Sequence, residues 1–196
     1  MKCLVVVAHP DDEAIWMGGT ILRHRDWEWH ILSLCRAGDP DREPHFWHAA
    51  REFGARAGIS NLDDSPVLAE LSPDLLEIKV RIRSFASEVY DLIFTHGENG
   101  EYERHPRHEQ THCAVSNMVT KGELKGILTC FAYINGCPDM LAPIIVHLTE
   151  AEHATKRRII HDIYGFGAGS FEFEAAGPIE AFRYCREGAN ENPIAL

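Results

Sequence analysis

Residues 3–13 read CLVVVAHPDDE, and the change of character within this stretch indicates the fold. Residues 3–8 form a continuous apolar run rich in valine, which is typical of a strand buried on both faces in a parallel sheet. The following residues, EAIWMGGTILRHR (13–25), place apolar side chains near helical spacing. The sequence therefore predicts a buried strand, a short connection at residues 9–12 and then a helix.

Alternating strand and helix patterns continue along the chain. They predict an α/β fold of the Rossmann-like, three-layer kind, with a mostly parallel sheet and helices on both faces. A chain of 196 residues favours one domain over two, so we expect residues 1–196 to form a single domain. The expected strands are 27–35, a short one near 60–63, 91–96, 126–134, 142–148 and a last or edge strand at 179–185; the expected helices are 44–58, 73–90, 107–120 and 150–165.

The charge balance bears on which partners the protein binds. The chain has 30 acidic and 19 basic residues and a formal net charge of -11. Contacts with phosphate need clustered lysine and arginine, and the sequence has no basic run. We therefore expect no binding to nucleic acid or to anionic lipid surfaces. The sequence leaves the oligomeric state open, with a homo-oligomer as one alternative.

The six cysteines and the apolar segments suggest a location. None of the cysteines forms a CxxC pair, and several lie within apolar runs such as KCLVVVA and LTCFAYI, where cysteine behaves as a small buried hydrophobe. Reduced thiols and a cytoplasmic location are the simpler interpretation. The N-terminal apolar run is only about six residues long, and no segment reaches the ~18 apolar residues of a membrane span. We expect neither a signal peptide nor a membrane span.

The connection after the first strand concentrates charge. His9, Asp11 and Asp12 lie within four positions, and the two neighbouring carboxylates repel each other. A cation relieves that repulsion, and Zn²⁺ binds both histidine nitrogen and aspartate oxygen. Alternatively, the acids cap the next helix, whose N-terminus favours negative charge. Capping accounts for one acid and leaves His9 and the stiff turn at Pro10 unexplained.

A second polar segment, THGENGEYERHPRHEQTH (95–112), follows the strand expected at 91–96. His105 and His108 are three residues apart at the start of a predicted helix, and His112 follows on the same face. We expect structural roles for His96 and His112. Active sites in parallel sheets gather beyond the carboxyl ends of strands. The two segments together supply the three ligands that an open zinc site needs and leave one carboxylate as a general base.

The motifs resemble those of a known family. AHPDDE at 8–13 is complete, HPRH at 105–108 follows NGEY at 99–102, and EAFR stands at 180–183. This combination resembles the LmbE/PIG-L family of zinc-dependent N-deacetylases. The resemblance implies one LmbE/PIG-L-like deacetylase domain across residues 1–196. It also implies removal of an N-acetyl group from an N-acetylglucosamine-type sugar or glycoconjugate, with a metal-bound water attacking the amide carbonyl.

The resemblance assigns roles to five residues. It implies that His9, Asp12 and His108 bind zinc, that Asp11 is the general base, and that His105 stabilises the oxyanion or acts as general acid. Fe²⁺ or another divalent ion is an alternative, because two histidines and one carboxylate also suit iron.

Two positions depart from the family pattern. Arg107 stands where many members have an aspartate that orients the neighbouring histidine. An arginine cannot accept a hydrogen bond, and near His105 it would lower the pKa of that ring. Tyr102 lies one residue further from His105 than in members with the sequence YGHPDH, which changes its expected contact with substrate.

Other residues at the strand ends are candidates for substrate contact. Arg42 and Asp64, together with Tyr102, are the ones we select; Arg36, Asp39 and Asp63 lie in the same loops and could contact sugar hydroxyls or a phosphate. Alternative functions are an amidase acting on a thiol conjugate or other small N-acyl amine, and a non-catalytic metal-binding or nucleotide-binding Rossmann-like module. An acidic loop after the first strand disfavours the nucleotide, because it would repel a pyrophosphate.

Overall fold

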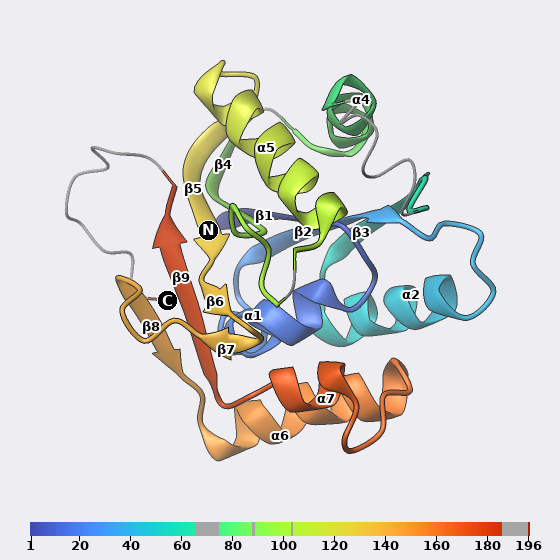
Figure 1. The fold of residues 1–196 in the computed structure, drawn as a ribbon, viewed down its shortest axis with the longest axis vertical. Coiled ribbons are helices and arrows are strands. Elements are labelled where there is room, and N and C mark those ends of the chain that lie inside the picture. Colours follow the sequence, from blue (N-terminus) through green and yellow to red (C-terminus); the bar gives the residue numbers. More distant parts are fainter. Residues whose placement is uncertain (66–74, 88, 103, 186–195) are drawn as a thin grey trace.

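A seven-stranded sheet dominates the computed structural model, which describes residues 1–65, 75–87, 89–102, 104–185 and 196 (Figure 1). Its strands, in chain order, are β1 (Lys2–Val7), β2 (Glu28–Cys35), β3 (Arg56–Leu62), β4 (Val89–Thr95), β5 (Lys125–Phe131), β8 (Ile144–His147) and β9 (Ile179–Tyr184). A separate two-stranded sheet pairs β6 (Tyr133–Ile134) with β7 (Cys137–Pro138). The helices are α1 (Asp12–Arg23), α2 (Arg42–Phe53), α4 (Leu75–Phe85), α5 (Pro106–Thr120), α6 (Glu150–Arg158), the π-helical η1 (Ile159–Ile163) and α7 (Phe171–Ala175).

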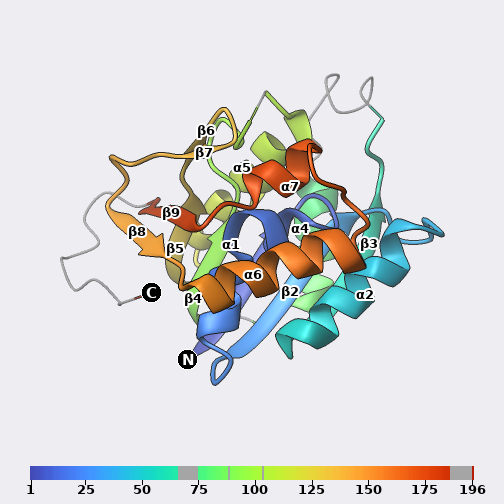
Figure 2. The same ribbon diagram turned by 90° about the horizontal axis from the view of Figure 1, so that it is seen from below.

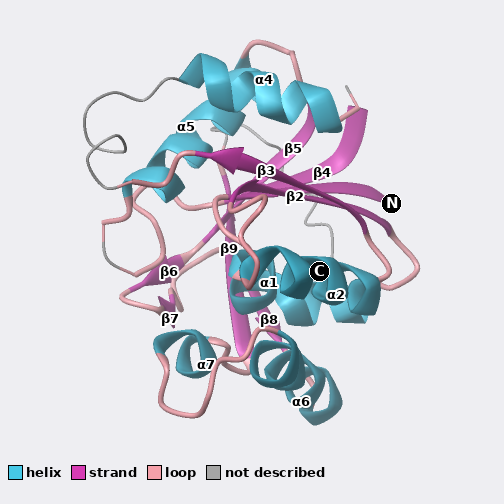
Figure 3. Ribbon diagram, turned by 90° about the vertical axis from the view of Figure 1, so that its right-hand side faces the viewer, coloured by secondary structure: helices cyan, strands magenta, loops and turns pink. Residues whose placement is uncertain are grey.

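The sheet is mostly parallel, with strand order β3-β2-β1-β4-β5-β9-β8. The first five strands in this order pair in parallel, whereas β9 pairs antiparallel with both β5 and β8. Helices cover both faces: α4 and α5 lie on one side, α1 and α2 on the other, and α6 and α7 pack outside α1 (Figures 2 and 3). The predicted fold class is confirmed.

β1 shows why a run of apolar residues gives this arrangement. Cys3, Val5 and Val7 point into the core beneath α1, and Leu4 and Val6 point into the core beneath α5. Every position of the strand therefore meets apolar side chains, as expected of a central strand in a three-layer fold. Because the strand order reverses between β1 and β4, the crevice beyond their carboxyl ends is the favoured place for a ligand in such sheets.

Some predicted boundaries were wrong, and glycines explain the clearest case. The helix expected at 44–58 ends at Phe53, because Gly54 adopts the left-handed conformation (φ 68°) that terminates helices. Gly58 lies within β3, where an added Cβ would stand 2.5 Å from the ring of Phe85. β3 is therefore longer than the strand expected near 60–63.

Two further boundaries differ from the prediction. The helix expected at 73–90 ends at Phe85, and β4 already begins at Val89; residues 73, 74 and 88 of that expected helix lie outside the described residues. The strand expected at 126–134 ends at Phe131, and Tyr133 turns away to pair with β7. Among the described helices, none has the length and apolar character that crossing a bilayer demands.

The cysteines follow the expectation only in part. Cys3 and Cys35 are buried free thiols, as their apolar surroundings indicate. Cys130, expected to be another buried free thiol, is instead joined to Cys185 in a disulfide, with Cα atoms 6.2 Å apart. The antiparallel pairing of β5 with β9 brings these two residues together across 55 positions of sequence. Spacing along the chain gives no sign of that contact.

The buried carboxylate of Glu180 holds α1, the helix that follows the AHPDDE loop, against the sheet. Glu180 of β9 accepts hydrogen bonds from the N–H groups of Gly19 and Thr20 in α1, each at 2.8 Å, and from the Thr20 hydroxyl at 2.7 Å. Lys156 of α6 completes the group with an ion pair of 2.8 Å, and neither charged side chain is exposed. The pair ties α1 to the sheet and to the outer helix layer.

Replacing Glu180 with alanine should therefore destabilise the protein strongly. The change leaves Lys156 buried without its partner, which typically lowers the free energy of unfolding by about 3–5 kcal/mol. Chemical denaturation measures the effect. Glu52→Ala, which removes the half-exposed partner of Arg158, is the matched control and should change stability by about 1 kcal/mol or less. Equal effects of the two substitutions would contradict this account.

Candidate active site

The AHPDDE loop gives each of its acids a different partner. Asp11 adopts a left-handed backbone conformation (φ 113°) that non-glycine residues rarely take and that commonly marks functional sites. It occupies the N-cap of α1, but its side chain makes no capping bond and instead accepts one from Arg42 at 2.8 Å. Glu13 holds the turn in place by accepting the Asp11 N–H and the hydroxyl of Tyr164. The side chain of Asp11 therefore does not cap α1, although Asp12 and Glu13 lie in the first turn of that helix, where its dipole favours acids.

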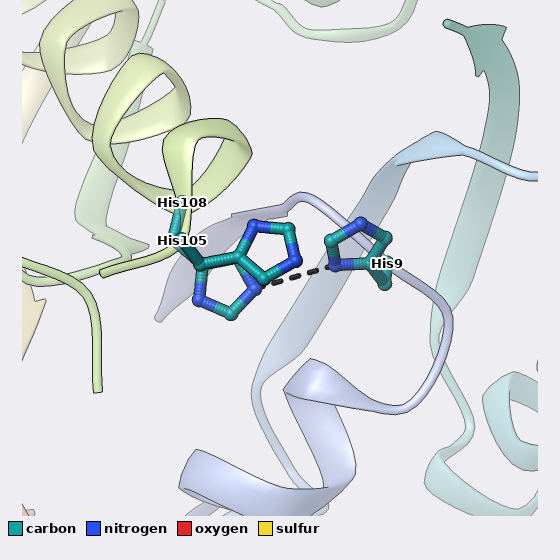
Figure 4. A group of neighbouring side chains, drawn as sticks. All are labelled: His9, His105 and His108. Atoms are coloured by element: carbon teal, nitrogen blue, oxygen red, sulfur yellow. Dashed lines mark hydrogen bonds between the residues drawn. The ribbon is translucent and has the colours of Figure 1, made fainter. Parts of the chain in front are cut away.

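Three atoms from the two polar segments converge at the carboxyl ends of β1 and β4. Nδ1 of His9 lies 3.3 Å from Nε2 of His108 (Figure 4). Oδ2 of Asp12 lies 3.5 Å from each of these nitrogens. All three residues were selected from the sequence as metal ligands, and the fold brings their side chains to one point.

The hydrogen-bond partners of the two rings determine whether Nδ1 of His9 and Nε2 of His108 carry a proton or a lone pair. Nε2 of His9 lies 3.0 Å from Asp64, and Nδ1 of His108 lies 2.7 Å from Glu101. A carboxylate can only accept, so each bond requires the ring proton on that nitrogen. When both rings are neutral, they consequently direct lone pairs at the Asp12 carboxylate. In that state all three atoms are acceptors; Oδ2 of Asp12 also accepts the backbone N–H of His9 at 2.9 Å, and a proton or a metal ion between the three atoms relieves their repulsion.

The spacing of the three atoms suits zinc. Ligand bonds of about 2.0–2.2 Å in a tetrahedral site place the donor atoms about 3.3–3.6 Å apart. The observed separations, between 3.3 and 3.5 Å, fit this requirement. Three protein ligands also leave a fourth position open, as in catalytic zinc sites. Two histidines and one carboxylate suit Fe²⁺ as well, so geometry alone leaves the ion open.

The local potential favours a positive charge. Burial opposes a charged imidazole, yet the bonds to Asp12 and Asp64 raise the pKa of His9 to about 10. Although Asp12 is buried, His108 and His96 lower its pKa well below the usual range. The site therefore attracts a cation, and a metal ion would displace a proton when it binds.

His96 belongs to the site but does not offer a free ligand atom. Its Nε2 lies 3.4 Å from Asp12, which makes Asp12, His96 and His108 a second grouping with ligand spacing. However, that nitrogen accepts the Ala8 N–H at 2.9 Å, and Nδ1 bonds to Glu101 at 2.9 Å. Both nitrogens are committed, which agrees with the structural role expected for this residue.

His105 lies at the rim of the group, stacked on His108 with ring centroids 4.4 Å apart. Burial, followed by the charges of His108 and His9, lowers its pKa to about 4. Within the described part of the chain its buried Nδ1 has no hydrogen-bond partner, so no carboxylate orients the ring there. Arg107 turns instead toward Gln110, and the shift of the His105 pKa comes from the other groups named above.

Asp11 stands beside the metal group with a shifted pKa of its own. Burial, reinforced by the neighbouring charge of Asp12, raises the pKa of Asp11 well above its usual range, although Arg42 opposes the shift. Arg42 in turn lies over the ring of Phe166, 4.7 Å from its centroid. A buried carboxyl with a raised pKa is suited to proton transfer.

The site opens into a cavity of about 420 Å³. Arg42, Asp64 and Tyr102, the three residues selected for substrate contact, all line it. Sequence reasoning missed Trp16 and Phe171, which also line the cavity. Phe171 packs on Tyr102 with centroids 4.2 Å apart, so these rings form an aromatic wall beside the polar one. Phe171 comes from α7, which has no motif of its own, and the apolar spacing of α1 gives no hint that Trp16 borders a cavity.

Another group with ligand spacing lies apart from this cavity and consists of His112, Cys130 and Cys185. Nδ1 of His112 bonds to the carbonyl oxygen of His96 at 2.9 Å, and Nε2 lies 3.3 Å from the Ser116 hydroxyl. Because both nitrogens have partners and both sulfurs share a disulfide, this group offers no ready ligand.

Comparisons with known proteins identify the family and the fold. A sequence profile of the PIG-L family, described as GlcNAc-PI de-N-acetylase, matches residues 4–119, which is more than half of the chain. The chain belongs to the PIG-L family. The matched part of this PIG-L member runs from β1 to the end of α5 and contains both polar segments. Among curated proteins, no sequence matches the chain significantly.

Several solved structures share the fold at low sequence identity. The conserved protein TT1542 from Thermus thermophilus is 21% identical, with 94% of each chain covered and a TM-score of 0.68. The N,N'-diacetylchitobiose deacetylase from Pyrococcus horikoshii is 19% identical, with 93% of this chain and 82% of that chain covered and a TM-score of 0.67. GalB, the 4-carboxy-2-hydroxymuconate hydratase from Pseudomonas putida, is 16% identical, with coverage of 98% and 99% and a TM-score of 0.69.

Substitutions should separate the ligands from their neighbours. We expect Asp12→Ala and His108→Ala to abolish stoichiometric zinc binding, because each removes one of three converging atoms. His105→Ala should retain the metal, since its ring lies at the rim of the group. Elemental analysis after dialysis against zinc measures the outcome. Loss of zinc in His105→Ala with retention in Asp12→Ala would show that His9, His105 and His108, whose nitrogens also have ligand spacing, form the site instead.

Proposed function

We propose that this PIG-L member is a zinc-dependent hydrolase that removes an N-acetyl group from an N-acetylglucosamine-type sugar or glycoconjugate. The observation that carries the proposal is the set of three converging atoms, at zinc spacing, with a fourth group, the Asp11 carboxyl of raised pKa, beside it in one cavity. A metal-binding protein without catalysis has no use for that fourth group.

His9, Asp12 and His108 would hold the metal. When bound there, zinc polarises an amide carbonyl and lowers the pKa of water toward ~7. The protein supplies the rest: Asp64 and Glu101 orient the two imidazoles, and the Trp16 indole N–H donates to Asp12 at 3.1 Å. These contacts set the ligand atoms in position before substrate arrives, which is how outer hydrogen bonds tune metal sites.

Asp11 would transfer the protons, and His105 would stabilise the negative charge that develops on the carbonyl oxygen. Arg42 binds Oδ2 of Asp11 and fixes the carboxylate, and we assign Oδ1 to accept the proton of the attacking water and to pass it to the leaving amine. His105, whose pKa near 4 keeps it neutral, would donate a hydrogen bond to the carbonyl oxygen as charge develops there. The products are acetate and a free amine.

The cavity walls support a sugar as substrate. A volume of about 420 Å³ is within the usual range for small ligands. Arg36 and Asp64, joined by a 2.7 Å ion pair, present groups that bond hydroxyls, while Tyr102 and Phe171 present ring faces that pack on the C–H face of a sugar. The family description, GlcNAc-PI de-N-acetylase, and the chitobiose deacetylase among the structural neighbours name substrates of this kind.

Asp11→Asn tests the proton-transfer role. The substitution keeps the size of the side chain but removes the base, so turnover should fall by roughly 10²–10⁴-fold. Zinc content should stay at the wild-type level, because Asp11 is not one of the converging ligands. Acetate release and metal analysis on the same preparation give both numbers. Near-normal turnover in Asp11→Asn would remove Asp11 from the mechanism.

A substrate panel tests the reaction class. The zinc-loaded enzyme should release acetate from N-acetylglucosamine derivatives, and a chelator should abolish the activity until zinc is restored. Thiol conjugates and small N-acyl amines form the second arm of the panel and represent the amidase alternative. Because the same fold occurs in a hydratase, an unsaturated carboxylic acid forms the third arm. Turnover confined to the second or third arm would contradict the deacetylase proposal.

A further inference from the structure

Glu101 makes an unusual set of contacts beneath the site. Its carboxylate is fully buried, and a single oxygen, Oε2, meets two imidazoles: Nδ1 of His108 at 2.7 Å and Nδ1 of His96 at 2.9 Å. The other oxygen, Oε1, accepts the N–H of Gly97 at 2.7 Å. Both oxygens therefore face nitrogen atoms and act as acceptors, as an ionised carboxylate does.

The backbone around Glu101 is shaped for these contacts. An added Cβ at Gly97 would stand 2.8 Å from the Phe131 carbonyl oxygen, so only glycine lets the loop run this close to β5. Gly100 adopts a positive φ of 74° directly before Glu101. The loop 97–100 thus folds back on itself, and the side chain of Glu101 returns beneath the end of β4.

We propose that Glu101 is a positioning residue that sets the ring tautomer of His96 and His108 at once, and thereby creates the metal-binding face of the site. Because Oε2 accepts from both Nδ1 atoms, both rings carry their proton there. Each Nε2 is left with a lone pair. For His108 that lone pair faces Asp12 and His9; for His96 it accepts the Ala8 N–H.

One carboxylate consequently organises both polar segments. It orients a ligand of α5 directly, and through His96 it holds the backbone of Ala8, the residue before His9. It also adds a negative charge near the metal, relayed through the His108 ring. Two neutral histidines and one carboxylate leave a divalent ion with one positive charge uncompensated, and Glu101 supplies the balance. This inference rests on the proposed metal site but not on the identity of the substrate.

Glutamine at position 101 cannot replace these contacts. If its amide oxygen meets the two imidazoles, its NH₂ group faces the Gly97 N–H, and two donors oppose each other. If the NH₂ group meets the imidazoles, both rings must carry their protons on Nε2, and the proton of His108 then points at the metal position. Either arrangement weakens metal binding, whereas the size and shape of the side chain are unchanged.

The direct test is the tautomer of each ring in the metal-free, full-length protein. Long-range ¹H–¹⁵N NMR spectra of histidine side chains, recorded at a pH at which both rings are neutral, distinguish a proton on Nδ1 from one on Nε2. His96→Gln and His108→Gln spectra assign the signals. We expect both rings to be protonated on Nδ1 in the wild type. A proton on Nε2 of either ring overturns the proposal, whatever the outcome of the activity assays.

Zinc affinity gives a second readout, by competition with a chromophoric chelator. Glu101→Gln should weaken zinc binding by about 10–100-fold and move the His108 proton to Nε2 or broaden its signal. Glu180→Gln is the matched control, since Glu180 is equally buried and accepts two backbone N–H groups but lies outside the site. It should lower stability and leave zinc affinity and both tautomers unchanged. Equal zinc affinity in Glu101→Gln and wild type would contradict the proposal; if Glu101→Gln does not fold, the wild-type tautomers still decide it.

Discussion

The parallel pairing of β1 with β4 joins two segments that are almost ninety residues apart in the sequence. Val6 lies opposite Thr95 in the register, so both strands end at the same level and their loops leave side by side. The imidazole of His96 spans the two ends, from the Glu101 carboxylate to the Ala8 N–H. A shift of this register would separate His9 from His108, and the converging ligand atoms would be lost.

Charge neutralisation explains the layout of the AHPDDE loop. Three consecutive acids are buried in a protein that already carries a net charge of -11. Arg42 forms an ion pair with Asp11, and the converging ligand atoms around Asp12 attract a cation. Burial raises the pKa of Glu13 to about 7, although the bond from the Tyr164 hydroxyl opposes the shift. The strained backbone at Asp11 is sustained by the same contacts. Local rules of stability are broken where the chemistry is placed, as expected of functional sites.

Much of this arrangement could be predicted from the sequence, because its signals are local. A valine-rich run gives a buried strand, and the AHPDDE motif after it places His9 and Asp12 at a strand end. The HPRH motif places His108 at the start of a helix, where Pro106 occupies the first turn. Such patterns need only the period of one element and the rule that parallel strands end at one edge.

The features that could not be predicted from the sequence depend on contacts between distant segments. Glu101 lies within the NGEY segment, but nothing in that segment indicates its contacts, and its importance appears only when two imidazoles meet one of its oxygens. Phe171 reaches the cavity because α7 packs against α1, and Cys130 meets Cys185 because a late strand pairs antiparallel with β5. Arg107 stands out in the sequence because it replaces the aspartate of the family motif. Its side chain nevertheless bonds to Gln110, and its effect on His105 could not be predicted from its position.

The central claim is that one ion is shared between the ends of β1 and β4. Anomalous diffraction recorded on both sides of the zinc absorption edge, from crystals of the zinc-loaded protein, tests it most directly. The account predicts a single strong peak within about 2.0–2.2 Å of Nδ1 of His9, Oδ2 of Asp12 and Nε2 of His108. No peak at that position, or a peak bound instead by His112 and the Cys130 and Cys185 sulfurs, would contradict it.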